Sequence, residues 1–244
     1  MSFDPALFGF GANIASAYQR KMDVYNRGFS GYNTDWALPI LRQILPKVED
    51  QHREAARIEL MTIFFGANDA ALPFSPQHVP LDRYKANLKT MIDMIKQPSS
   101  PYYNPNLRLL LITPPPLNES QWSERCKENG TPLDRLSDNT RHYAETVIAF
   151  GMEHNIPVID IWSSLSEKAK DHSDGLCFFS FDGLHLNGNG YKVLFDLVME
   201  TIQHHYPEIH PNNIDMEIPA WRNINLDDIE NQVKFRLLQP PNNH

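Results

Sequence analysis

The chain has 244 residues, of which 41% are hydrophobic, and this composition suits one α/β domain with a sizeable core. Its formal net charge of −8 gives it no basic surface for nucleic acid, and its longest apolar run, at residues 107–112, is too short to cross a bilayer. Its two cysteines do not make a disulfide framework, so we predict a reducing, cytoplasmic setting. From the charge and the short apolar runs, we predict neither nucleic acid nor membrane as a partner.

Periodicity and composition predict helices that alternate with strands along the chain. In order, we expect a helix at 12–21, a strand at 23–29, a helix at 35–45, a strand at 59–65, a helix at 81–96, a strand at 107–112, a helix at 138–153, a strand at 157–161 and a helix at 190–205. Thr34 or Asp35 is the expected N-cap of the second helix. Residues 113–136 are predicted to form a long loop, in which Trp122 either lines a ligand pocket with Leu117 and Pro116 or belongs to an ordinary surface excursion.

The alternation of elements favours parallel βαβ units in one α/β domain over residues 1–206. Residues 207–244 are rich in proline and asparagine, and we predict an extension that packs on the domain or is partly loose. Two roles stay open for its Ile218 and Trp221: reaching back toward a cleft, or joining two copies in a homodimer.

Three polar blocks, at residues 27–33, 66–69 and 182–187, lie at or just after the carboxyl ends of predicted strands. In open α/β sheets, ligands bind at that edge of the sheet. We therefore expect the three blocks to meet in one cleft.

The block at 182–187 contains the parts of a general base. In an irregular loop, the carboxylate of Asp182 can reach Nδ1 of His185 three residues later and fix the tautomer of its ring. Gly183 relieves the tight backbone between them. The free Nε2 can then take a proton from a hydroxyl nucleophile, as acyl transfer requires. A structural histidine is the alternative, and the adjacent Asp182 favours catalysis.

The other two blocks contain donors suited to an oxyanion. The side-chain NH2 of Asn68 can project from the end of a strand into the cleft, and the backbone N–H of Gly31 can approach a ligand without a Cβ in the way. The alternatives are that Asn68 caps a loop and that Gly31 serves only a turn, while Asp69 is predicted to be structural.

In this order the three blocks resemble conserved blocks of the SGNH (GDSL-type) hydrolases. Residues 18–24, 29–38 and 220–222 are also similar to sequences in the isoamyl acetate-hydrolysing esterase group of this family. With them, the resemblance covers most of residues 8–222. The resemblance implies a three-layer α/β/α fold with a mostly parallel, flavodoxin-like sheet. It also implies that Gly31 and Asn68 are oxyanion donors, that Asp182 is the orienting acid and that His185 is the general base. The implied reaction is hydrolysis of a small acetate-like ester through an acyl-serine intermediate, with no metal or organic cofactor.

The fourth block of this family, Gly-Asp-Ser, occurs nowhere in the sequence. We expect it, and the central first strand that leads to it, to lie upstream of residue 1 in the natural protein. Ser2 and Ser30 are disfavoured as substitute nucleophiles. The alternative is an inactive truncated or splice form that binds a ligand or regulates a partner, and a third possibility is a polysaccharide or lipid deacylase.

No metal site is predicted. His172, Asp174 and Cys177 are close in sequence, but their spacing matches no strong zinc pattern.

Overall fold

The structure is a computed structural model that describes residues 8–51 and 57–234. Its helices and strands are α1 (Phe10–Ala17), α2 (Thr34–Ile44), β1 (Leu60–Phe64), α3 (Leu81–Lys96), β2 (Arg108–Ile112), α4 (Glu119–Glu128), α5 (Ser137–His154), β3 (Val158–Ile159), α6 (Ile161–Lys168), α7 (Gly188–His205) and α8 (Ile229–Gln232). The predicted helix at 81–96 is confirmed with the same bounds, and most other predicted elements match an observed one to within about four residues at either end.

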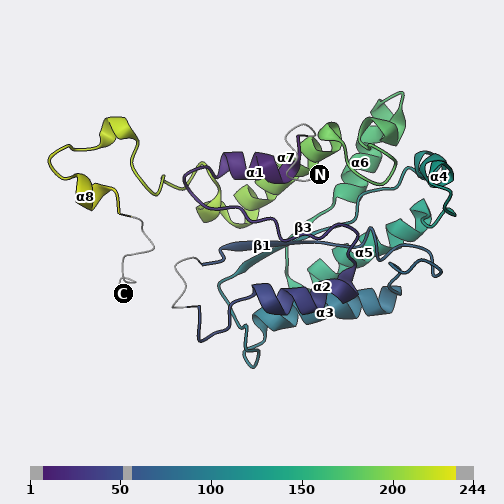
Figure 1. Ribbon diagram of the computed structural model, residues 1–244, viewed down its shortest axis with the longest axis horizontal. Helices are drawn as coiled ribbons and strands as arrows, with labels where there is room; N and C mark the ends of the chain where they lie inside the picture. Colours follow the sequence, from purple (N-terminus) through teal and green to yellow (C-terminus); the bar gives the residue numbers. More distant parts are fainter. Residues whose placement is uncertain (1–7, 52–56, 235–244) are drawn as a thin grey trace.

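Three layers make up the fold, with the sheet in the middle (Figure 1). Helices α1, α6 and α7 cover one face of the sheet, while α2, α3 and α5 cover the other. Each face has its own apolar core: Tyr84, Leu88 and Phe150 are fully buried on one side, and Leu194 and Ile161 on the other. The predicted three-layer α/β/α class is therefore confirmed.

The described sheet has three parallel strands in the order β1-β2-β3. The central strand, β2, is buried along almost its whole length, as expected for a strand that is covered on both faces. The predicted strand at 23–29 is wrong, because these residues have no strand conformation. A strand persists only where a neighbour takes its backbone hydrogen bonds, and none of the three described strands pairs with this segment.

Two further corrections concern the start of α2 and the presence of α4. The N-cap of α2 is Asn33, whose Oδ1 accepts a hydrogen bond of 3.0 Å from the backbone N–H of Trp36. Thr34 cannot serve as that cap because its hydroxyl is bonded to Asp69 and Asn87. The predicted long loop at 113–136 contains α4, which is capped by Asn118 and has Cys126 as its buried residue. With so little apolar surface, α4 carries no clear amphipathic signal in the sequence.

The start of the predicted extension packs on the domain. Tyr18 donates its hydroxyl to the carbonyl of Ile209 at 2.8 Å, and the N–H of Glu217 donates to the carbonyl of Arg20 at 2.9 Å. Farther along, α8 projects away from the three layers (Figure 1). Trp221, earlier in the same extension, is 74% exposed. The boundary at residue 206 and a role in a homodimer stay predictions. Within the described ranges, no helix is long and apolar enough to cross a bilayer.

Candidate active site

Asp182 and His185 are in direct contact. The Nδ1 atom of His185 lies 2.8 Å from Oδ2 of Asp182, as the spacing of three predicted. The other oxygen, Oδ1, accepts hydrogen bonds from the backbone N–H groups of His185, at 2.9 Å, and Leu184, at 3.1 Å. Burial alone would raise the pKa of Asp182, but these hydrogen bonds outweigh it and lower the pKa to about 2. The carboxylate is therefore ionised at neutral pH and holds Nδ1 as the protonated nitrogen of the ring.

A tight loop presents this pair. The N–H of Phe181 donates to the carbonyl of His185 at 2.7 Å, and Gly183 at the tip has a left-handed φ of +91°. The start of α4 lies against the tip, where the N–H of Asn118 donates to the carbonyl of Gly183 at 2.8 Å. The side chain of His185 is 45% exposed, so solvent can reach it. The loop therefore holds the imidazole of His185 in a position that solvent can reach.

Asn68 follows β1 and is held at both ends of its amide. Its Nδ2 donates to the carbonyl of Tyr32 at 2.8 Å, and its Oδ1 accepts from the guanidinium of Arg135 at 3.1 Å. No residue in the described ranges accepts from the second N–H of the amide. That N–H is available to a ligand.

Gly31 lies one residue before Tyr32 and has a φ of +78°, a conformation that favours glycine. Its carbonyl accepts a hydrogen bond of 2.7 Å from Nε2 of Gln77. The structure thus brings the Gly31 loop and the Asn68 loop together, as predicted. Their roles as oxyanion donors remain predictions.

Asp69 anchors the Asn68 loop to α2. It is fully buried, and its Oδ1 accepts from the N–H of Thr34 at 2.9 Å and from its hydroxyl at 2.5 Å. Burial raises the pKa of Asp69 despite these bonds. The short carboxylate thereby satisfies donors at the start of the helix.

The two halves of the site meet through Trp122, which the sequence offered as a candidate pocket residue, and through Asp134 and Arg135, which it did not point to. The ring of Trp122 lies 6.4 Å from that of His185, and its Nε1 donates to Asp134 at 2.9 Å. Asp134 pairs with Arg135 at 2.6 Å, and Arg135 bonds to Asn68. An isolated arginine in a predicted loop gives no sequence signal for such a position, because its partners are far away along the chain.

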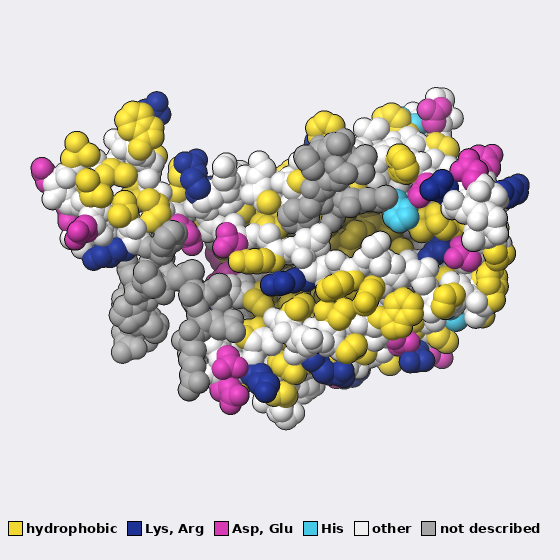
Figure 2. Space-filling view, in the orientation of Figure 1, with side chains coloured by type: hydrophobic (Ala, Val, Ile, Leu, Met, Phe, Trp, Pro, Cys, Tyr) yellow, Lys and Arg dark blue, Asp and Glu magenta, His cyan; other side chains and the backbone are white. Residues whose placement is uncertain are grey.

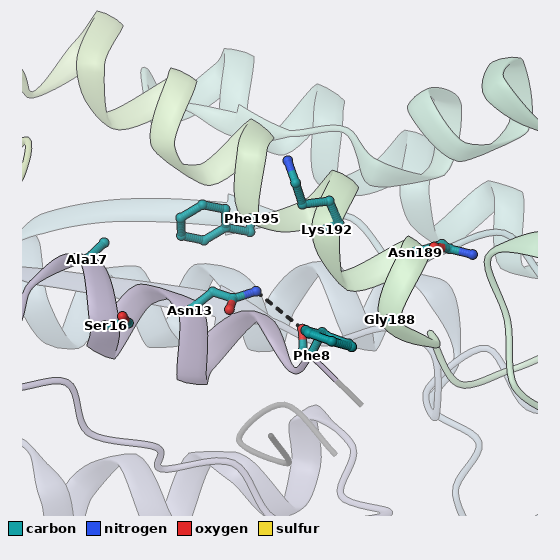
Figure 3. A pocket seen from close by; sticks show the side chains of 8 residues that line it. All are labelled: Phe8, Asn13, Ser16, Ala17, Gly188, Asn189, Lys192 and Phe195. Atoms are coloured by element: carbon teal, nitrogen blue, oxygen red, sulfur yellow. Dashed lines mark hydrogen bonds between the residues drawn. The ribbon is translucent and has the colours of Figure 1, made fainter. Parts of the chain in front are cut away.

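None of the four predicted site residues lines the open groove of about 560 Å³ that lies between α1 and α7 (Figure 3). Its lining includes Phe8, Asn13 and Phe195, and its lysine, Lys192, pairs with Asp196. The groove has one serine, Ser16, in its lining, but the lining contains no histidine or carboxylate that could act as its base. Hydrophobic side chains also gather between the α1 layer and the α2 layer, where Figure 2 shows a hollowed face.

No serine hydroxyl in the described ranges is hydrogen-bonded to His185. The same ranges contain no cluster of three His, Cys, Asp or Glu side chains that could hold a metal ion.

Comparison with known proteins gives consistent matches. The model of the GDSL-like lipase/acylhydrolase family matches residues 4–193. The human isoamyl acetate-hydrolyzing esterase 1 homolog is 38% identical over 218 residues, which cover 88% of this chain and 81% of that protein. The isoamyl acetate-hydrolyzing esterase of Saccharomyces cerevisiae is 32% identical over 92% of this chain and 87% of its own length.

Solved structures match the fold. A lipase/acylhydrolase from Enterococcus faecalis superposes with a TM-score of 0.57 at 23% identity, covering 88% of this chain and 90% of that one. An acetylxylan esterase, Axe2, from Geobacillus stearothermophilus has a TM-score of 0.56 at 21% identity, with coverages of 83% and 84%.

Proposed function

We propose that this chain, which belongs to the GDSL-like lipase/acylhydrolase family and is a carboxylic ester hydrolase, acts on short-chain, acetate-like esters through an acyl-serine intermediate. The observation that carries the proposal is the 2.8 Å contact between Asp182 and Nδ1 of His185. It supports a base that is already oriented and has its second nitrogen free.

In the proposed reaction, Nε2 of His185 takes the proton from a serine hydroxyl as its oxygen attacks the ester carbonyl carbon. Asp182 stabilises the imidazolium that forms. The second N–H of Asn68 and the backbone N–H of Gly31 donate to the oxyanion, and such a donor contributes about 3 kcal/mol to the transition state. His185 then gives its proton to the departing alcohol, and a water molecule, activated by the same base, releases the acid.

Two observations support an ester with small apolar parts. The relatives with 32% and 38% identity are named for the hydrolysis of isoamyl acetate. Beside Gly31, the rings of Phe29, Tyr32 and Trp36 form a cluster with centroids 5.2 and 5.7 Å apart, and Phe29 and Trp36 are exposed. Exposed aromatic rings next to an oxyanion donor suit an apolar alcohol or acyl group.

The nucleophile of the proposed reaction is a serine. A second candidate function, a non-catalytic form that binds an ester or a partner, is favoured by one observation: no described serine is hydrogen-bonded to His185. The two functions differ in whether the natural protein reacts with a serine-directed probe.

The test is fluorophosphonate labelling of the natural protein in its source extract, with peptide mapping of the labelled residue and hydrolysis of isoamyl acetate by the purified protein. We expect a label on one serine, and a loss of about 10³-fold or more in kcat/KM for His185→Ala. The matched control is His204→Ala, which changes an exposed histidine on α7 and should keep full activity.

Undiminished hydrolysis by His185→Ala would refute the base assignment. No label, together with an intact mass that matches these 244 residues, would instead favour the binding role.

A further inference from the structure

Arg135 is a buried cation at the centre of the candidate site, with 3% of its surface exposed. Its Nε donates to the carbonyl of Ala67 at 3.2 Å, and one terminal nitrogen donates to Asp134 at 2.6 Å. The other terminal nitrogen donates to Oδ1 of Asn68, at 3.1 Å, and to Oε1 of Gln77, at 2.6 Å. A guanidinium that is removed from water and bonded on every side is a fixed reference point for its neighbours.

The contact with Asn68 determines which way its amide faces. A guanidinium only donates, so the atom beside it must be the amide oxygen. The amide nitrogen is thereby turned toward the carbonyl of Tyr32, to which it gives one N–H at 2.8 Å. The second N–H is left to point elsewhere. If the amide flipped, a donor would face the cation and the oxyanion position would receive an oxygen lone pair instead.

The contact with Gln77 extends the same control to Gly31. Because Oε1 of Gln77 accepts from Arg135, its Nε2 faces the carbonyl of Gly31, to which it donates at 2.7 Å. The backbone of Gln77 also accepts from Nδ2 of Asn33 at 3.0 Å. This hydrogen bond fixes the peptide plane between Gly31 and Tyr32. The N–H of Gly31 belongs to the preceding plane, which shares the Cα of Gly31 with the fixed one. Arg135 therefore bonds directly to Asn68 and, through the side chain of Gln77, to the carbonyl of Gly31.

Two neighbours hold Arg135 in place. Asp134 neutralises its charge, and the indole of Trp122 lies 5.4 Å from the guanidinium carbon. Trp122 is also bonded to Asp134, so the three side chains form one unit. Placing an unpaired cation at this depth would be costly, and this unit removes most of that cost.

We propose that Arg135 is a positioning residue that, with Gln77, sets the orientation of the two oxyanion donors for ester hydrolysis. It touches neither the ester nor the reacting atoms. The inference rests on the proposed function, because it assigns a purpose to the orientation of Asn68 and Gly31.

The test uses the natural, fluorophosphonate-reactive protein with two substitutions that retain much of the local chemistry. Arg135→Lys keeps the charge, but one ammonium cannot serve Ala67, Asn68 and Gln77 together. Gln77→Glu keeps an acceptor for Arg135, but it replaces the donor to Gly31 with a carboxylate oxygen and adds a negative charge. Arg141→Lys is the matched control, since Arg141 is exposed on α5 and forms only surface ion pairs.

We expect Arg135→Lys and Gln77→Glu each to lower kcat about tenfold or more, with KM changed less than about threefold, because the donors act on the transition state. Arg141→Lys should stay within about twofold of the parent protein. In an Asn68→Ala background, Arg135→Lys should lower kcat by less than about threefold, because one of the donors that it orients is already gone.

A merely structural role gives a different pattern. A kcat within twofold of the parent in the folded Arg135→Lys protein overturns the inference, and so does an unchanged fold-loss in the Asn68→Ala background. Full activity in His185→Ala overturns the proposed function instead.

The side-chain amide NMR signals of Asn68 give a readout that does not depend on activity. They should shift in Arg135→Lys and stay in place in Arg141→Lys. Unshifted signals in both proteins overturn the inference even in a preparation that hydrolyses no ester.

Discussion

A substitution at Gly183 tests most directly how α4 supports the 182–187 loop. An alanine there would place its Cβ 2.5 Å from the carbonyl oxygen of Asn118 and 2.6 Å from the backbone nitrogen of Trp122. Both atoms are backbone, so the first turn of α4 would have to move as a whole by roughly 1 Å to reach an ordinary contact distance. The φ of +91° adds strain for any residue with a Cβ.

The expected cost can be divided with a matched control. Gly130 also has a left-handed φ, of +65°, but a Cβ there would meet nothing within 4 Å. Gly130→Ala should therefore cost only the backbone strain, about 1–2 kcal/mol. Gly183→Ala should cost that strain and overpacking of about 1–3 kcal/mol more. For a domain of this size, the totals correspond to falls in Tm of roughly 2–8 °C for Gly130→Ala and 4–20 °C for Gly183→Ala.

Thermal unfolding followed by circular dichroism measures both values under the same conditions. Activity adds a second readout, since a shift of α4 separates Trp122 from His185 and should lower kcat for Gly183→Ala while Gly130→Ala keeps it. Equal falls in Tm for the two variants would show that α4 can move from the loop without cost. The reasoning about close packing would then be refuted.

Two further predictions concern the site itself. Asp182→Asn should lose about 1–2 kcal/mol of stability at pH 6, because the folded-state pKa of about 2 lies below the usual value of 3.8. A depressed carboxyl pKa stabilises the fold above the unfolded pKa and ceases to do so as pH falls through the folded one, so the deficit should vanish between about pH 4 and pH 2. Urea unfolding at several pH values tests this, and a deficit that stays constant with pH would contradict it. Asn68→Ala should lower kcat by about 10²–10³-fold and change KM much less; steady-state kinetics on an acetate ester would disprove the donor role if only KM changed.

Local signals in the sequence were enough to predict most of the helices and the buried strands. In α3, buried Tyr84, Leu88 and Ile95 recur at helical spacing, so the pattern predicted both ends. The segment at 23–29 has a strand-like composition, but a strand depends on a neighbour, and composition does not show whether one is present. The polar helix α4 was not predicted for a related reason. Its first turn is held by hydrogen bonds to Phe181 and Gly183, and it has no wide apolar stripe that the sequence could show.

The same distinction applies to the site. The contact between Asp182 and His185 was predictable, because a spacing of three in a tight loop brings the two groups together without help from the rest of the fold. The position of Arg135 was not, because its partners Asn68 and Gln77 lie 67 and 58 residues away. Nothing in the local sequence around Arg135 distinguishes it from the exposed arginines nearby.

The segment from Asn118 to Arg135 links the two halves of the site. The candidate base comes from the loop before α7, and the candidate donors come from loops after β1 and before α2. Neither half determines its distance from the other, since no hydrogen bond in the described ranges joins His185 or Asp182 directly to Asn68 or Gly31. The segment contacts both, through Asn118 and Trp122 at one end and Arg135 at the other. Changes within it should therefore impair the base and the donors together, whereas changes within either half should impair only one of them.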